Sequence, residues 1–116
     1  MTQQILDCLF CRVASGEIPA TVVSETDQTI AFRDIEPQAP VHVLVIPRDH
    51  YQDIGALSDA DPGLAGALMQ AATKAAAAEG LTDYRLVLNT GATAGQSVFH
   101  VHAHVLGGRP MAWPPG

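Results

Sequence analysis

The segment that most constrains this chain is residues 100–106, HVHAHVL, in which histidine alternates with apolar residues. A period of two predicts an extended strand, because successive side chains of a strand point to opposite faces. The three imidazoles would then share one face, and the apolar side chains would pack on the other. Imidazole has an unperturbed pKa of about 6.5, so it can donate, accept or attack near neutral pH. We therefore predict one packing face and one chemical face.

Three neighbouring histidines can also indicate a metal site, but this spacing makes one shared ion difficult. Same-face neighbours on a strand lie about 6.6 Å apart at Cα, so His100 and His104 would lie about 13 Å apart. Bonds of about 2.0 Å to one ion do not easily bridge that distance. A pair could chelate, and a solvated strand without chemistry is the remaining alternative. We expect the three histidines to divide their roles.

The length and net charge of the chain limit the number of domains and the kinds of partner that it can have. A chain of 116 residues supports one core, so we expect a single domain over residues 1–116. A net charge of -6 argues against a nucleic-acid polymer as partner, since that binding depends on Lys and Arg neutralising phosphates. No apolar run reaches about 18 residues, and residues 1–4 lack the features of a secretory signal. We expect a cytoplasmic protein that does not bind membranes.

The remaining patterns predict an α+β chain. A short helix is expected from Asp7, its cap, to about Ser15, and a longer helix from a capping box at Ser58 to about Glu79. Residues 48–57 form a polar connection with at most one helical turn. Strands are expected at residues 21–25, 29–33, 41–46 and 84–89, the first two forming a hairpin. Residues 90–97 form a loop of small residues whose glycines let backbone amides approach an anion.

Residues 95–108, GQSVFHVHAHVLGG, resemble the signature of the histidine triad (HIT) superfamily. Residues 17–20, 34–47 and 113–116 (WPPG) resemble its histidine triad nucleotide-binding (Hint) branch. The resemblance implies a HIT-like fold with a five-stranded antiparallel sheet, one long helix and a short N-terminal helix. It also implies a homodimer whose sheets join across the dimer, and hydrolysis or transfer at the α-phosphate of a purine nucleotide.

Neutral imidazole suits that chemistry, because it is uncharged enough to approach an anion and basic enough to attack phosphorus. We predict His102 as the nucleophile, with a backbone carbonyl at Nδ1 fixing its tautomer and a nucleotidyl-histidine intermediate that water cleaves. His104 and the amides of residues 95–97 would bind the phosphate oxygens, and Ser97 would assist the leaving amine. His42 resembles the supporting histidine of the superfamily; alone in an apolar strand it would be read as a core residue.

The resemblance also assigns a nucleoside pocket. Asp34 matches the acid that accepts from both ribose hydroxyls, although a loop Asp otherwise caps a turn. Arg33 stands where relatives can carry histidine. The apolar walls around the base match residues that would otherwise be simple core: Leu9, Phe10, Val13, Ile18, Phe32 and Ile35. The predicted nucleotide contacts are completed by Asn89, Gly95, Gln96 and Trp113.

Cys8, Cys11, His50 and His100 form a second constellation. The two cysteines are three residues apart on the expected helix, so they face the same side. Two thiolates and two imidazoles are the ligands of a tetrahedral structural zinc, a site found in several superfamily members. A redox pair and two inert buried cysteines are the alternatives.

Together these features predict a purine nucleoside phosphoramidase that hydrolyses the P–N bond of adenosine 5'-phosphoramidates. The partners would be an AMP-like nucleotide and a second copy of the chain; Zn²⁺ would be structural, and no organic cofactor is expected. Two alternatives remain: a dinucleoside polyphosphate hydrolase or nucleotidylyltransferase of the same superfamily, and a non-catalytic nucleotide-binding or scaffold module.

Overall fold

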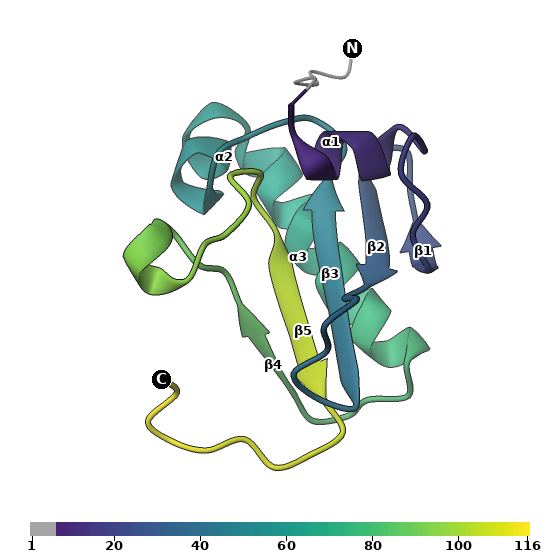
Figure 1. The fold of residues 1–116 in the computed structure, drawn as a ribbon, viewed down its shortest axis with the longest axis vertical. Coiled ribbons are helices and arrows are strands. Elements are labelled where there is room, and N and C mark those ends of the chain that lie inside the picture. The colour runs from purple at the N-terminus through teal and green to yellow at the C-terminus, as the bar shows by residue number, and fades with distance from the viewer. Residues whose placement is uncertain (1–6) are drawn as a thin grey trace.

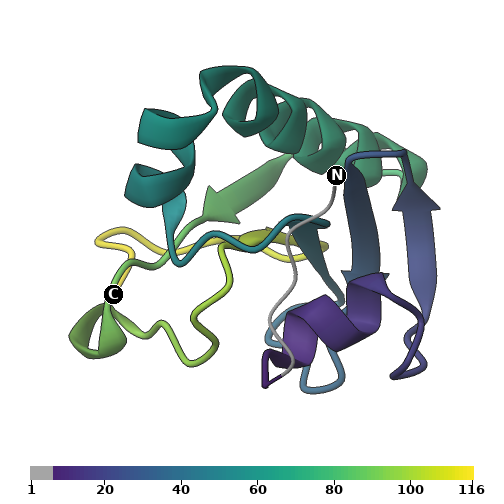
Figure 2. The same cartoon turned by 90° about the horizontal axis from the view of Figure 1, so that it is seen from above.

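The described residues form one β-sheet with helices packed on both of its faces (Figure 1). The computed structural model describes residues 7–116, so the segment 1–4 examined for a secretory signal lies outside the described residues. Seen from above, the long helix lies over one face of the sheet and the short N-terminal helix over the other (Figure 2). No helix within the described residues has the length and apolar character needed to cross a membrane.

Within the described part of the chain, the sheet has five antiparallel strands in the order β1-β2-β3-β5-β4. The strands are β1 (Val22–Glu25), β2 (Thr29–Arg33), β3 (Val41–Pro47), β4 (Tyr84–Val87) and β5 (Ala103–Gly107). The α+β class, the five-stranded antiparallel sheet and the β1-β2 hairpin are confirmed. Strand β4 ends two residues before the predicted Asn89, and it forms one edge of the sheet.

Alternation along the central strands creates two apolar cores. Val43 and Val45 are fully buried and pack in the cluster beneath the long helix, which contributes Leu68. Leu44 and Ile46 point to the opposite face, where they pack with Phe10 of the N-terminal helix. The second core therefore fixes the N-terminal helix beside the face of β3 and β5 that carries the polar side chains.

Residues 7–116 contain three α-helices, and two of their caps differ from prediction. Helix α1 (Leu9–Ala14) is capped by Cys8, whose Sγ accepts from the amide of Cys11 at 3.3 Å, so Asp7 is not the cap. Helix α2 (Ile54–Ala60) occupies the segment expected to contain at most one turn. Helix α3 (Pro62–Ala78) begins after Asp61, whose Oδ1 accepts from the amide of Leu64 at 3.0 Å.

Asp61 replaces the predicted cap Ser58 for a physical reason. Pro62 lacks an N–H and suits the first helical position, so the residue before it is the one placed to cap. Ser58 lies inside α2, and its hydroxyl donates to the carbonyl of Gly55 at 3.2 Å.

The prediction that residues 100–106 form one continuous strand is wrong, because β5 begins only at Ala103. The amide of Val101 donates to the carbonyl of Tyr51 at 2.7 Å, which removes this residue from the strand ladder. The three imidazoles therefore do not share one strand face. His100 is fully buried, and only His104 lies on β5, opposite Leu44 of β3.

Candidate functional site

His102 is held in one tautomer by the main chain. Its Nδ1 lies 2.8 Å from the carbonyl oxygen of His100, and a carbonyl only accepts, so Nδ1 must carry the proton. The lone pair of the ring is consequently on Nε2. The edge-on ring of Phe10, centred 5.0 Å from the ring of His102, restricts its rotation. His102 thus has the orientation expected of a neutral nitrogen nucleophile.

His104 belongs to a chain of hydrogen bonds that begins at a backbone amide. The amide of Gln38 donates to His42 Nδ1 at 3.0 Å, so the proton of neutral His42 is on Nε2. His42 Nε2 lies 2.9 Å from His104 Nδ1 and therefore donates to it. Register explains the contact: His42 pairs with Leu106, so His104 is its diagonal neighbour on the same face.

Asp34, directly after β2, completes this group. Its Oδ1 accepts from the amide of Glu36 at 2.8 Å, so part of the carboxylate does cap a turn, as the alternative interpretation held. Its Oδ2 lies 3.4 Å from His42 Nε2. The amide of Asp34 donates to the carbonyl of His42 at 3.0 Å, which continues the β2-β3 pairing and fixes this carboxylate beside the imidazoles.

Burial keeps these imidazoles neutral. It lowers the pKa of His104 to about 4; the neighbouring His102 and His42 act in the same direction, and Asp34 opposes them. Burial also lowers the pKa of His102, against the opposing effects of the His100 carbonyl and Asp34. The pKa of His42 is lowered by burial and raised by Asp34, with burial dominant. At neutral pH each ring therefore keeps one lone pair and one N–H.

A cavity of about 680 Å³ opens beside these rings, within the range of small-molecule sites. Its lining includes His102, His104, Asp34 and Ser97. All six residues predicted as apolar walls also line it: Leu9, Phe10, Val13, Ile18, Phe32 and Ile35. Asn89, Gly95, Gln96 and Trp113 are not among the lining residues, and neither is His42, which reaches the cavity through His104.

Several lining residues had no individual prediction: Pro19, Ala20, Thr21, Leu44 and Val98. Leu44 could have been found, because it is two residues from His42 on β3 and so shares its face. Arg33 also lines the cavity, and a bidentate pair with Glu79 at the end of α3 holds its guanidinium, with N–O distances of 2.8 and 3.0 Å.

The buried side chain of Gln96 stabilises the loop that precedes the histidines. Gln96 is 3% exposed; its Oε1 accepts from the amide of Gly91 at 2.9 Å, and its Nε2 donates to the carbonyls of Gln52 and Val98. The amides of Gly95 and Gln96 donate within the loop, to Ala92 and Gly91. These groups support the loop, and Ser97 is the member of the predicted 95–97 segment that lines the cavity.

Cys8, Cys11, His50 and His100 bring four candidate ligand atoms within 4.8 Å of one another. The sulfur–nitrogen distances are 3.3 Å from Cys8 to His100, 3.5 Å from Cys11 to His50 and 3.6 Å from Cys11 to His100. A tetrahedral ion with bonds of about 2.3 Å to sulfur and 2.0 Å to nitrogen separates such atoms by roughly 3.5 Å. The distances therefore fit a Cys2His2 metal site.

The hydrogen bond behind the ring of His100 also fits that site. His100 Nε2 lies 2.8 Å from the carbonyl of Pro47 and donates to it, which leaves the Nδ1 lone pair facing the sulfurs. Asp34, His42 and His104 form a second group with metal-type atoms. There the donor behind His42 is an N–H, so Nε2 carries a proton and does not fit a metal. Of these two groups, the first therefore fits a metal centre better, because the lone pair of His100 Nδ1 faces the sulfurs.

Fold and site together define a small α+β protein that places neutral imidazoles at a cavity of small-molecule size. Residues 15–111 match the HIT domain, and the chain belongs to this family. A HIT family hydrolase from Legionella pneumophila is 53% identical, with a TM-score of 0.90 over 95% of this chain and 100% of that one. A HIT family hydrolase from Clostridium thermocellum is 39% identical, with a TM-score of 0.90 over 94% and 96%. An uncharacterized HIT-like protein from Synechocystis is 49% identical over 95% of this chain and 97% of that protein.

Proposed function

We propose that this protein is a purine nucleoside phosphoramidase of the Hint branch, acting on adenosine 5'-phosphoramidates. The observation that carries the proposal is the tautomer of His102: Nδ1 donates to the carbonyl of His100, so the lone pair of a neutral, cavity-lining imidazole is on Nε2. The relatives described as hydrolases support a hydrolytic reaction.

In the proposed reaction, the Nε2 lone pair of His102 attacks the α-phosphorus and forms an N–P bond. The original P–N bond breaks, and its electron pair leaves with the amine, which takes a proton from the hydroxyl of Ser97. Water then attacks the phosphorus and gives a proton to the Ser97 oxygen, which restores its hydroxyl, and the electron pair of the N–P bond returns to Nε2. His104 donates from Nε2–H to the phosphate oxygens, where charge develops.

The nucleoside would occupy the apolar part of the cavity. Phe10 and Phe32 form an edge-on aromatic pair with ring centres 5.6 Å apart, which supports an apolar wall for a purine base. Ile35 is 94% exposed, and a base bound beneath it would cover this side chain. The Asp34 carboxylate would accept from the ribose hydroxyls with its remaining lone pairs.

Turnover of adenosine 5'-phosphoramidate tests the proposal. We expect His102→Ala to reduce kcat by at least roughly 10³-fold, because it removes the nucleophile, while the protein still binds AMP. Asp34→Asn should mainly raise KM. Mass spectrometry of quenched wild-type reactions should find one AMP group attached to His102.

Three outcomes would contradict the proposal. Faster cleavage of dinucleoside polyphosphates than of phosphoramidates would favour the hydrolase or nucleotidylyltransferase alternative. A wild-type protein that binds AMP but turns over no substrate would favour the non-catalytic module. An adduct on a residue other than His102 would remove the assigned nucleophile.

We also propose that Cys8, Cys11, His50 and His100 hold a structural Zn²⁺. The ion would fix α1 to the segment before β5, and it would supply no chemistry to the reaction because all four of its positions are taken by protein ligands. Elemental analysis of protein produced with ample zinc should find about one equivalent, and Cys8→Ser should lower it. Less than about a tenth of an equivalent in the wild type would refute the site.

A homodimer joined along the sheets is the third proposal. Strand β4 is an edge strand, so its outer backbone groups are available for a partner. Light scattering should give twice the chain mass of 12.2 kDa. A monomer at micromolar concentration would contradict it.

A further inference from the structure

We infer that the backbone amide of Gln38 fixes His42 and, through it, His104, so that His104 is a permanent hydrogen-bond donor at Nε2 and cannot accept a proton there. The rate consequence rests on the proposed function, whereas the tautomers are a property of the folded protein alone. Gln38 is thus a positioning residue that acts through two other side chains.

The direction of the hydrogen bonds from Gln38 through His42 to His104 follows from the first donor, the Gln38 amide. A backbone N–H can only donate, so His42 Nδ1, 3.0 Å away, must present a lone pair. Neutral His42 then has its proton on Nε2, where His104 Nδ1 is 2.9 Å away and Asp34 Oδ2 is 3.4 Å away. Both of these atoms act as acceptors. His104 Nδ1 therefore has no proton, and its single N–H must be at Nε2.

The opposite direction of the hydrogen bond, from His104 to His42, is excluded by the Gln38 amide. If His104 Nδ1 donated to His42 Nε2, neutral His42 would carry its proton on Nδ1, and two N–H groups would face each other across 3.0 Å. Protonating both nitrogens of His42 produces the same clash. Burial, which disfavours the charged form of both rings, acts in the same direction.

The amide of Gln38 is itself held in place. Its residue lies between Pro37 and the buried Ala39 in the loop that connects β2 to β3. The guanidinium of Arg109, beyond the end of β5, donates to the Gln38 carbonyl with N–O distances of 3.0 and 3.4 Å. The Gln38 side chain donates to the Glu36 carbonyl at 3.0 Å. These contacts favour one orientation of the loop peptide, so the donor is preorganised.

The consequence is a division of labour between the two histidines at the cavity. His102 offers a lone pair at Nε2, and His104 offers an N–H at Nε2. His104 therefore suits the negative oxygens of a phosphate and is unsuited to remove a proton from water or to protonate an amine. The proton of the leaving amine must come from another group. Thr21 and Ser97 are hydroxyl residues that line the cavity, and Ser97 belongs to the segment that leads directly to the histidines.

The decisive experiment replaces the peptide bond before residue 38 with an ester, which removes the N–H and retains the side chain. The ester oxygen would repel the lone pair of His42 Nδ1 and favour the other tautomer of His42, and hence of His104. ¹⁵N NMR of histidine-labelled protein distinguishes a protonated ring nitrogen from one with a lone pair. We expect wild-type His42 and His104 to be protonated at Nε2, and the ester variant to gain the Nδ1–H form of both.

With adenosine 5'-phosphoramidate as substrate, the ester should reduce kcat by about a hundredfold, since it removes one preorganised donor, with a smaller change in KM. Gln38→Pro removes the same N–H by ordinary mutagenesis and should give the same NMR pattern. Gln38→Ala is the matched comparison: it keeps the amide and removes only the side-chain bond to Glu36, so both tautomers should persist and kcat should fall far less than in the ester variant.

Two results would overturn the inference: wild-type His104 with a lone pair at Nε2, or an ester variant that retains both wild-type tautomers. An ester variant with changed tautomers and unchanged kcat would overturn the catalytic consequence. Wild-type protein that shows the expected tautomers but cleaves no phosphoramidate would refute the proposed function and confirm the tautomer chain, so the two failures are distinguishable.

Discussion

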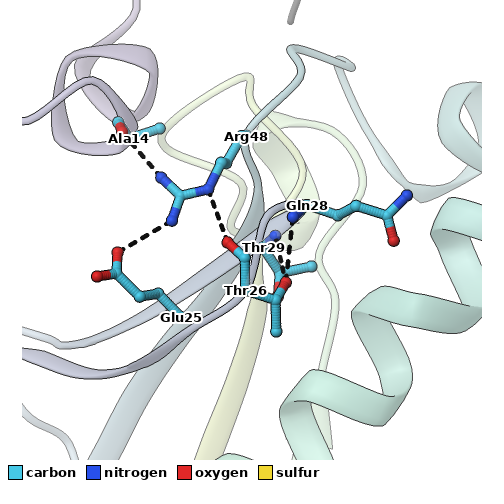
Figure 3. A network of polar contacts seen from close by, with 6 residues as sticks. All are labelled: Ala14, Glu25, Thr26, Gln28, Thr29 and Arg48. Carbon is cyan, nitrogen blue, oxygen red and sulfur yellow. Dashed lines mark hydrogen bonds and ion pairs between the residues drawn. The ribbon is translucent and has the colours of Figure 1, made fainter.

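The Arg48 guanidinium connects the end of α1 to the turn between β1 and β2 (Figure 3). Directly after β3, its guanidinium donates to the carbonyl of Ala14 at 3.1 Å, to the carbonyl of Thr26 at 3.0 Å and to the carboxylate of Glu25 at 2.9 Å. Ala14 is the last residue of α1, so the cation also lies at the negative end of that helix. We predict that Arg48 anchors α1 to the β1-β2 hairpin.

The substitution Arg48→Met keeps most of the aliphatic stem and removes all the donors. Each bond from the guanidinium to a backbone carbonyl is expected to contribute about 1.5 kcal/mol, the lower end for charged donors because the Arg48 side chain is 22% exposed. The pair with Glu25, whose side chain is 57% exposed, adds about 0.5 kcal/mol. The free energy of unfolding should fall by about 3.5 kcal/mol, which corresponds to a Tm lower by about 14 °C in a chain of this length.

Thermal and urea unfolding followed by circular dichroism measure this change. Arg85→Met is the matched control, because Arg85 donates one bond from an exposed position, to the carbonyl of Ala112 at 3.0 Å. The control should lose no more than about 1 kcal/mol. If Arg48→Met loses no more stability than Arg85→Met, the anchoring role is refuted.

Three further changes test the packing and the metal cluster. Leu68→Ala should lower the free energy of unfolding by about 3 kcal/mol because Leu68 is fully buried, whereas Leu9→Ala, at 47% exposed, should lose less than half as much in urea unfolding. Gly107→Ala should lower the Tm, because the new Cβ would lie 2.5 and 2.8 Å from the methyl carbons of Leu81; an unchanged Tm would show that Leu81 moves aside freely. A strong zinc chelator should lower the Tm of the wild type and leave that of Cys8→Ser unaffected, and equal responses would argue against the metal.

Periodicity predicted the sheet better than it predicted the ends of elements. The apolar run from Val41 and the Thr29–Arg33 run both form strands, because their side chains match the pleat and bury against helices. The start of β5 could not be predicted, since alternation continues through His100 and His102 while a contact with Tyr51, distant in sequence, removes this segment from the ladder.

In the site, too, the sequence predicted which residues take part but not the roles that depend on contacts between distant segments. The sequence and its family resemblance indicated the residues of the cavity walls, and the structure brings them together around His102 and His104. The structural role of Gln96 could not be predicted from its residue type alone, because its side-chain amide donates to carbonyls in two different segments. Gln38 was missed because its contribution is a backbone N–H, which any residue except proline has.

His100 contributes two separable groups: a ring that faces the cysteines and a carbonyl that accepts from His102. Every amino acid has that carbonyl, so exchanging the side chain at this position leaves the acceptor in the backbone. A descendant of this chain could therefore exchange Cys8, Cys11, His50 and the His100 side chain one by one and still keep the carbonyl that orients the His102 ring. The orientation of His102 is thus independent of whether the cluster of cysteines and histidines holds a metal ion.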